Sequence, residues 1–184
     1  LERWGIDPFE VVDASTSKAN YILIARTAGQ DLVVRIPVRR RRALFGYAWA
    51  CRQWEGAGVP VPRILLFNDR YLVETRLEGS DQHGGEEREW LIRELGSMVR
   101  RMHSVRTQGF GFIGKPGVGE KRTWRDYYAP FAQGEIAKVR RANLLPRELL
   151  DGVQEFFRRN EDVLRCDDPR LLHGDLKPTN ILTS

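Results

Sequence analysis

The sequence predicts an α+β protein in which a small antiparallel sheet of five strands with one helix is followed by a mainly helical part. Two observations support this prediction. Up to about residue 77 the chain carries five short runs rich in β-branched and aromatic residues, whereas from residue 86 apolar residues recur at helical spacing. With 184 residues the chain can bury a core as one domain or as two small lobes. We expect a sheet lobe at residues 1–79, a linker at 80–85 and a helical lobe at 86–184.

The first three strands are predicted at residues 9–13, 20–26 and 32–37. Small polar residues join the first pair, and a turn containing glycine joins the second pair. The third strand carries Arg35 among apolar neighbours. Because an unpaired buried charge is costly, Arg35 needs either a partner inside the protein or a place at an edge where it reaches solvent.

A helix is predicted at residues 42–56, and strands at 63–67 and 71–77 complete the sheet. Four apolar residues recur on this helix at helical spacing: Leu44, Tyr47, Cys51 and Trp54. The stretch Gly-Val-Pro-Val-Pro at 58–62 ends the helix sharply, because proline cannot continue it.

The second part begins with a helix that runs from about residue 86 to Ser104. Its apolar stripe consists of Leu91, Leu95, Met98 and Met102. His103 at its end is interpreted as a capping or packing residue. The Gly-rich stretch 109–119 lacks the flanking strand and helix of a dinucleotide site, so we interpret it as a loop. Two more helices are predicted, one after the N-cap Thr123 and one at about 146–164.

Composition and charge favour a globular protein without a nucleic-acid or membrane partner. Hydrophobic residues make up 41% and charged residues 30% of the chain, and the longest apolar runs have the length of a strand. The net charge is +5, but basic residues are dispersed except for four arginines at 39–42, which form a solvated face or a basic element near a phosphate site. Cys51 and Cys166 are too few for a disulfide framework or metal cluster, which favours the cytoplasm.

The last fifteen residues carry the chemistry. His173, Asp175 and Asn180 fit the pattern H-x-D-x-x-x-x-N, with apolar pairs on both sides. In a kinase catalytic loop this spacing lets the Asp face the acceptor hydroxyl while the Asn amide oxygen faces a magnesium ion. The alternative is an ordinary loop between two short strands, in which each residue alone would be unremarkable. All three at this spacing favour the catalytic interpretation.

His-Gly-Asp followed by Asn180, together with the Gly-Val-Pro-Val-Pro stretch, resembles the aminoglycoside phosphotransferase and choline kinase-like family. The resemblance implies a protein kinase-like fold with a five-stranded N-lobe and a helical C-lobe. It implies that Asp175 orients and deprotonates the acceptor hydroxyl, that Asn180 binds Mg²⁺, and that Arg35 holds the α- and β-phosphates of ATP. The Leu-Lys-Pro interior looks like that of Ser/Thr protein kinases, so Lys177 either neutralises charge on the transferring phosphoryl group or faces solvent.

The same resemblance implies two further nucleotide contacts. Ser17 and Asn20 match the loop that covers the phosphates, although a polar hairpin turn explains them equally well. Backbone groups from Glu74 through Arg76 to Leu77 correspond to the hinge that hydrogen-bonds the adenine edge, and the alternative is a plain strand end.

Two departures from the family pattern stand out. Kinases pair the cation of the third strand with a helix Glu, whereas the matching position here is Tyr47, and no acid occurs between Asp31 and Glu55. Arg35 therefore pairs elsewhere, or phosphate binding is altered. The chain also stops at Ser184, before the Asp that supplies the main magnesium ligand could occur. We therefore expect these 184 residues to be a fragment that is inactive by itself.

The predicted function is ATP-dependent transfer of the γ-phosphoryl group to a hydroxyl of a small molecule, such as an aminoglycoside or macrolide antibiotic, a sugar or an amino alcohol. From Asp81 onward basic residues slightly outnumber acidic ones, which does not favour a polycationic acceptor. Two alternatives are a Ser/Thr protein kinase, supported by the Leu-Lys-Pro interior, and an inactive kinase-like binding module, supported by the missing helix Glu. The absence of the G-x-G-x-x-G signature argues against the protein kinase.

Overall fold

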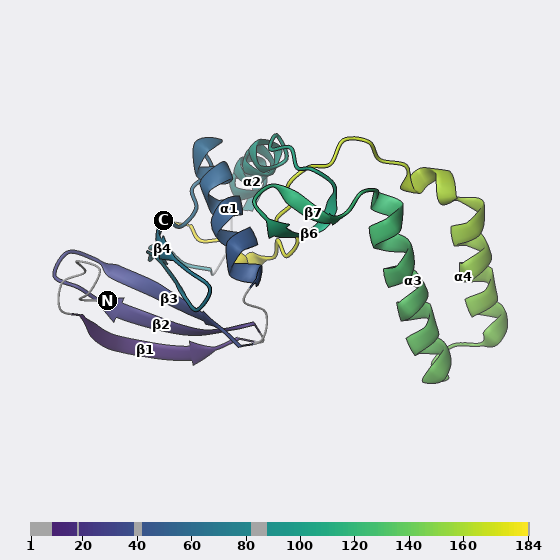
Figure 1. Ribbon diagram of the computed structural model, residues 1–184, viewed down its shortest axis with the longest axis horizontal. Coiled ribbons are helices and arrows are strands. Elements are labelled where there is room, and N and C mark those ends of the chain that lie inside the picture. The colour runs from purple at the N-terminus through teal and green to yellow at the C-terminus, as the bar shows by residue number, and fades with distance from the viewer. Residues whose placement is uncertain (1–8, 18, 39–41, 82–87, 184) are drawn as a thin grey trace.

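A computed structural model of the protein describes residues 9–17, 19–38, 42–81 and 88–183 (Figure 1). Residues 39–41 of the arginine run and residues 82–85 of the expected linker lie outside these ranges. The interpretations of both segments stay predictions.

The N-terminal part forms the five-stranded antiparallel sheet that the sequence predicts. Its strands are β1 (Glu10–Thr16), β2 (Asn20–Arg26), β3 (Asp31–Pro37), β4 (Ile64–Phe67) and β5 (Leu72–Thr75). They lie in the order β1-β2-β3-β5-β4, so β5 is inserted between β3 and β4. Helix α1 (Arg42–Gly56) connects β3 to β4 and has the bounds that its apolar spacing predicts.

The side chains of β5 are buried on both of its faces, because it is an inner strand of the sheet and helix α1 covers one face. On the face that carries Leu72, helix α1 contributes a cluster of Leu44, Ala48 and Cys51 with Ile64. On the opposite face, Val73 packs with Ala25, Leu32 and Val34. Since side chains alternate along a strand, Glu74 lies on the same face as Leu72. A carboxylate is thereby placed in the layer between the sheet and α1.

The Gly-rich stretch that we expected to be a loop forms a β-hairpin, so that expectation was wrong. Strands β6 (Phe110–Lys115) and β7 (Val118–Lys121) form a separate two-stranded sheet that packs against α1. Gly46 on α1 permits this contact, because a Cβ there would lie 2.2 Å from the carbonyl oxygen of Ile113. Gly117 forms the turn with φ +74°, a conformation that other residues rarely adopt.

The remaining elements are helical. Helix α2 (Arg88–Met102) precedes the hairpin, and α3 (Trp124–Arg141) and α4 (Arg147–Arg159) follow it. Thr123 caps α3 as predicted, accepting a 3.0 Å hydrogen bond from the amide of Asp126. The helix expected at 146–164 is divided, because a 3-10 turn (Glu161–Leu164) replaces its last part. No helix in the described ranges is both long and apolar enough to cross a membrane.

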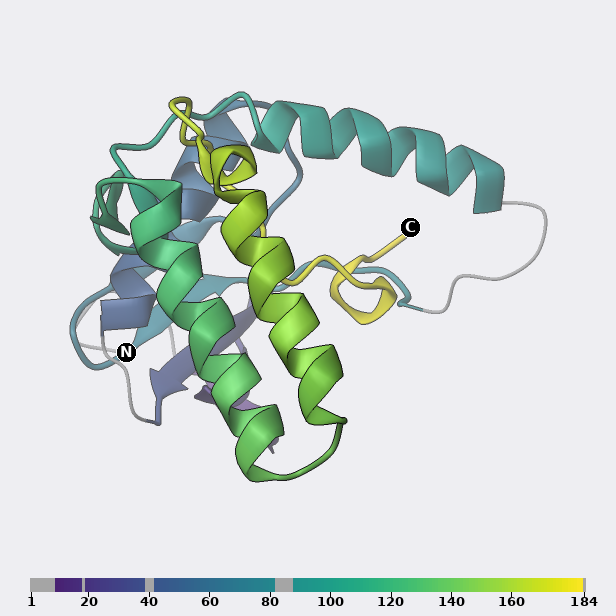
Figure 2. The ribbon, with the colours of Figure 1, turned by 90° about the vertical axis from the view of Figure 1, so that its right-hand side faces the viewer.

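Helices α3 and α4 lie side by side and run in opposite directions, and they project from the body on the side away from the sheet (Figures 1 and 2). Aromatic contacts line them, including Tyr128 with Phe157 at 6.3 Å between ring centroids. On α2, Met102 is buried, whereas Leu91 and Leu95 in the same predicted stripe are half-buried.

Candidate active site

The predicted catalytic loop, between Leu171 and Thr183, is held by backbone hydrogen bonds at both of its ends. Before it, the amide of Leu171 donates to the carbonyl of Val105 at 2.9 Å. After it, Ser80 and Thr183 exchange two backbone hydrogen bonds of 2.9 and 3.0 Å. Gly79 lies so close to this pair that a Cβ would be 2.8 Å from the Thr183 carbonyl oxygen, and its φ is +135°. The loop therefore lies between the end of α2 and the segment that follows β5.

His173 connects this loop to helix α1. Its ring stacks on the buried indole of Trp54, with 5.9 Å between centroids and an interplanar angle of 18°. Its Nδ1 accepts a 3.4 Å hydrogen bond from the amide of Asp175, two residues later. Leu171 joins Trp54 and Met102 in one buried cluster. The predicted scaffold role of His173 agrees with these contacts, because the ring stack keeps the loop close to α1 and the Nδ1 hydrogen bond holds the backbone of Asp175.

The structure brings Asp175, Lys177 and Asn180 together. The Lys177 Nζ lies 3.2 Å from the Asp175 Oδ2. The Asn180 Nδ2 donates to the Asp175 backbone carbonyl at 2.8 Å and to its Oδ2 at 3.0 Å. A short 3-10 turn, Pro178–Asn180, returns the chain so that these contacts form. Hydrogen bonds from Lys177 and Asn180 lower the pKa of the Asp175 carboxyl, which keeps it ionised and able to accept a proton.

The donor atoms of this cluster fit a magnesium ion held together with a nucleotide. Because the Asn180 Nδ2 faces Asp175, its Oδ1 is directed to the other side of the amide, and amide and carboxylate oxygens are the ligands that Mg²⁺ prefers. Within the described residues no group of three or more His, Cys, Asp or Glu side chains could hold a metal. Asn180 would therefore be one ligand of such an ion, and the carboxylate that the kinase pattern adds is the Asp expected after Ser184.

Arg35 has a partner that the sequence did not reveal. Its Nε lies 2.7 Å from the Oε1 of Glu74, and Tyr47 donates its hydroxyl to the other oxygen at 2.8 Å. The guanidinium also lies over the Tyr47 ring, 5.2 Å from its centroid. Burial lowers the pKa of Arg35, but Tyr47 and Glu74 together raise it above its usual value. Burial raises the pKa of the neighbouring Cys51 thiol to about 11, so it stays protonated.

The three residues expected at the hinge, Glu74, Arg76 and Leu77, differ from one another in their surroundings. Glu74 pairs with Val33 and Ile64, so it is a strand residue with its side chain in the core. The amide of Arg76 donates to the carbonyl of Asp31 at 3.2 Å. Leu77 lies beyond the end of β5. The predicted adenine contact of Glu74, Arg76 and Leu77 stays a prediction.

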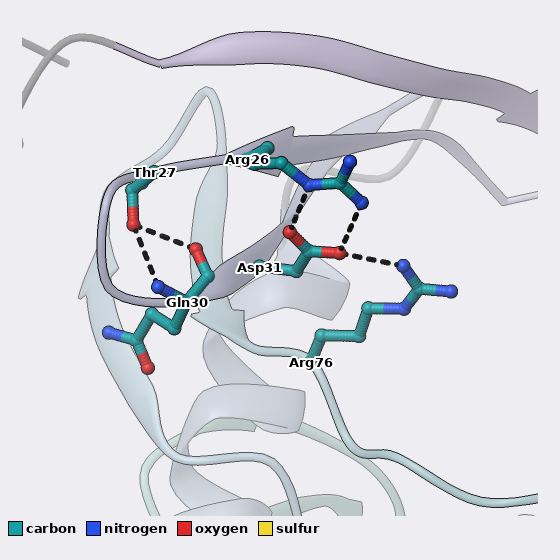
Figure 3. Close-up of polar contacts among 5 residues, drawn as sticks. All are labelled: Arg26, Thr27, Gln30, Asp31 and Arg76. Carbon is teal, nitrogen blue, oxygen red and sulfur yellow. Dashed lines mark hydrogen bonds and ion pairs between the residues drawn. The ribbon is translucent and has the colours of Figure 1, made fainter.

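An ion-pair network fixes Arg76 to the turn between β2 and β3 (Figure 3). The Asp31 carboxylate accepts hydrogen bonds from both Arg26 and Arg76, each with a shortest distance of 3.0 Å. The bond from Arg26 is the main reason why the pKa of Asp31 is lowered. The Arg76 side chain is therefore used to hold the strand end in place.

Ser17 and Asn20 bond to each other in the turn between β1 and β2. The Ser17 Oγ accepts a 2.9 Å hydrogen bond from the amide of Asn20 and lies 3.0 Å from its carbonyl oxygen. These hydrogen bonds close the hairpin, as expected if Ser17 and Asn20 belong to a polar hairpin turn. Contact of either residue with nucleotide phosphates stays a prediction.

Helix α1 lies between the two polar clusters of the site. Tyr47 contacts the Arg35–Glu74 pair, and Trp54 contacts the catalytic loop. These helix residues are seven positions apart and share a face, about 10.5 Å along the axis. No contact joins Arg35 directly to Asp175 within the residues that the structure describes. The paired Arg35 and the Asp175 loop thus lie at opposite ends of one helix face, which is the arrangement that a kinase-like fold predicts for its phosphate-binding cation and its general base.

Comparison with known proteins agrees with this class. Residues 9–184 match the profile of the phosphotransferase enzyme family (APH), and the chain belongs to that family. Hygromycin-B 4-O-kinase of Escherichia coli is 25% identical over 146 residues, which are 72% of this chain and 42% of that protein.

Solved aminoglycoside phosphotransferases share the fold. A thermostable mutant of APH(4)-Ia in complex with AMP-PNP and hygromycin B aligns with a TM-score of 0.67 at 19% identity, covering 95% of this chain and 63% of that one. The streptomycin–ATP–APH(2")-IIa complex aligns with a TM-score of 0.66 at 16% identity, covering 97% and 62%. The family resemblance and the kinase-like fold predicted from the sequence are thus confirmed. The chain spans less than two thirds of the length of these relatives.

Proposed function

We propose that the protein transfers the γ-phosphoryl group of ATP to a hydroxyl of a small molecule. The observation that carries this proposal is the Asp175–Lys177–Asn180 cluster, in which one carboxylate is kept ionised by an adjacent cation and amide. Arg35, held by Glu74, supplies a cation for the α- and β-phosphates. The APH family membership and the nucleotide present in two of the structurally similar proteins support ATP as the donor.

The proposed reaction needs few groups, because phosphoryl transfer depends mainly on positioning and electrostatics. The acceptor hydroxyl gives its proton to the Asp175 carboxylate as its oxygen bonds to the γ-phosphorus. The bond from that phosphorus to the β–γ bridging oxygen breaks, and ADP leaves. Lys177 stabilises negative charge on the transferring group, and Asn180 directs its Oδ1 toward the metal position. A magnesium ion, held in part by Asn180, would neutralise negative charge on the phosphates.

The relation to hygromycin-B 4-O-kinase favours a polyhydroxylated antibiotic as the acceptor class. The observation that favoured an inactive binding module was the missing helix Glu, and it loses its force because Arg35 has a carboxylate partner in Glu74. Generic protein phosphorylation is not favoured, because the family profile is that of the APH phosphotransferases.

The test is an ATP-consumption assay on the protein expressed from its complete coding sequence. Hygromycin B, other aminoglycosides, macrolides, sugars and amino alcohols are offered as acceptors. We expect turnover with one acceptor class and a loss of about 10²–10⁴-fold in kcat for Asp175→Ala, which removes the general base. The matched control is Asp167→Ala, an exposed Asp just before the loop, which should keep wild-type turnover. Unchanged turnover in Asp175→Ala would contradict the assignment.

A further inference from the structure

The sheet register places Glu74 beside Arg35 without any help from helix α1. Arg35 on β3 is paired with Leu72 on β5, and Glu74 is paired with Val33. Residues two apart on a strand share a face, so Glu74 is the diagonal neighbour of Arg35 on the side that faces α1. Diagonal neighbours are within reach of long side chains, and here their charged atoms meet at 2.7 Å. The β ladder therefore fixes the spacing of this ion pair.

The two partners of this ion pair differ in burial, because the Glu74 carboxylate is buried whereas the Arg35 guanidinium is partly exposed to solvent. The Glu74 side chain is 1% exposed, whereas that of Arg35 is 27% exposed. Among the described residues, Arg35 donates to the Oε1 of Glu74 and Tyr47 donates to its Oε2. Arg35 uses its Nε in this bond, so the bond to Glu74 does not occupy the two terminal nitrogens, which carry four of the five N–H donors.

Tyr47 restrains the same pair from the helix. Its hydroxyl holds the carboxylate, and its ring lies under the guanidinium at 5.2 Å, within the range of a cation–π contact. At this helix position the kinase pattern has the acid itself. In this protein the helix contributes only a neutral hydroxyl and a ring face, and the negative charge comes from β5.

We propose that Glu74, assisted by Tyr47, is the positioning residue that aims Arg35 at the nucleotide phosphates, so that the sheet and not helix α1 holds the phosphate-binding cation. This inference rests on the proposed function. It predicts that phosphate recognition depends strongly on Glu74 and more weakly on Tyr47, because loss of the hydroxyl leaves the ion pair intact.

The experiment compares binding of ATP, ADP and adenosine to the protein from its complete coding sequence, in the presence of Mg²⁺. We expect Glu74→Gln to weaken ATP and ADP binding about tenfold, the effect of a lost charge-assisted interaction, while adenosine affinity stays within about twofold. Tyr47→Phe should change the ratio of ATP to adenosine affinity in the same direction but less. In an Arg35→Ala background, Glu74→Gln should have no further effect on that ratio.

The matched control is Glu155→Gln, the same chemical change in an exposed ion pair of α4, and it should leave all three affinities unchanged. Equal loss of ATP and adenosine binding in Glu74→Gln, or no loss, would overturn this inference while leaving the proposed function standing. If Glu74→Gln does not fold, Tyr47→Phe decides: it should lower the ratio of ATP to adenosine affinity in the wild type but not in an Arg35→Ala background, and an unchanged ratio in the wild type overturns the inference. A wild-type protein that binds no ATP overturns both proposals.

Discussion

At the scale of single residues, the catalytic loop stabilises the charged form of its carboxylate by local contacts. Lys177 and Asn180 come within 3.2 and 3.0 Å of the same Asp175 oxygen, and both lower the pKa of that carboxyl. The group is exposed, so solvent screens the interaction and its main effect is on protonation, not on folding stability. A carboxylate that is ionised over a wider pH range can act as a base over that range.

Replacing Lys177 by Met should raise the pKa of Asp175 toward the ordinary value for an aspartate, because the largest cause of its depression is removed. In the wild type the contact with Lys177 favours the native state above the pKa of the unfolded chain, and this contribution is lost as pH falls through the depressed native pKa. An NMR titration of the Asp175 carboxyl measures the shift. The control is Lys138→Met on α3, which should leave the titration of Asp175 unchanged; equal titration curves for wild type and Lys177→Met would contradict the prediction.

Local spacing decides which site residues a sequence can predict. Asp175 and Asn180 are five positions apart, and a turn brings them together wherever the loop lies. Arg35 and Glu74 are 39 positions apart, and their contact depends on the insertion of β5 beside β3 and on its register. The periodicity of the sequence predicts neither the strand order nor the register. From its position in the chain, Glu74 is therefore predicted only as a hinge residue. The local sequence gives one indication that Glu74 is buried: it lies inside the strand, directly after the apolar Val73.

At the scale of secondary-structure elements, the contact between α1 and the β6–β7 hairpin depends on one glycine. A Cβ added to Gly46 would lie 2.2 Å from a backbone oxygen of β6, which cannot move aside as a side-chain tip could. The strands predicted from β-branched runs and the helices predicted from apolar spacing are present, because burial imposes those patterns. The hairpin does not follow from the sequence, because its glycines replace the side chains that would show alternation.

Gly46→Ala should therefore destabilise the protein by about 1–3 kcal/mol, the usual cost of forcing atoms into a packed contact. Gly96→Ala is the matched control, since Gly96 also lies within a helix, α2, but nothing lies within 4 Å of its added Cβ. That change should stabilise the protein by about 0.5–1 kcal/mol, because alanine favours the helix more than glycine does. Urea unfolding of both variants gives the two free energies, and a destabilised Gly96→Ala or an unaffected Gly46→Ala would contradict this account.

At the scale of the whole molecule, helix α1 connects the sheet to the catalytic loop through two separate contacts. Its first half packs on the sheet and bonds to Glu74, and its second half packs with α2 and the loop through Trp54. The Ser80–Thr183 backbone pair forms another connection at the far end of the loop. If the sheet holds the phosphate-binding cation, then weakening the Trp54 contact should disturb the general base without disturbing phosphate recognition.

Trp54→Leu tests this separation of roles. The change removes the aromatic pair with His173, which contributes about 0.5–1.5 kcal/mol beyond its buried area, and lets the catalytic loop move. We expect kcat to fall about 10–100-fold, because small misplacements of a reacting group are costly, while the ratio of ADP to adenosine affinity stays at the wild-type value. Trp90→Leu, at an exposed tryptophan of α2, is the control and should keep both quantities. A fall in phosphate recognition equal to the fall in kcat would show instead that the whole helix, and not the sheet, sets the position of Arg35.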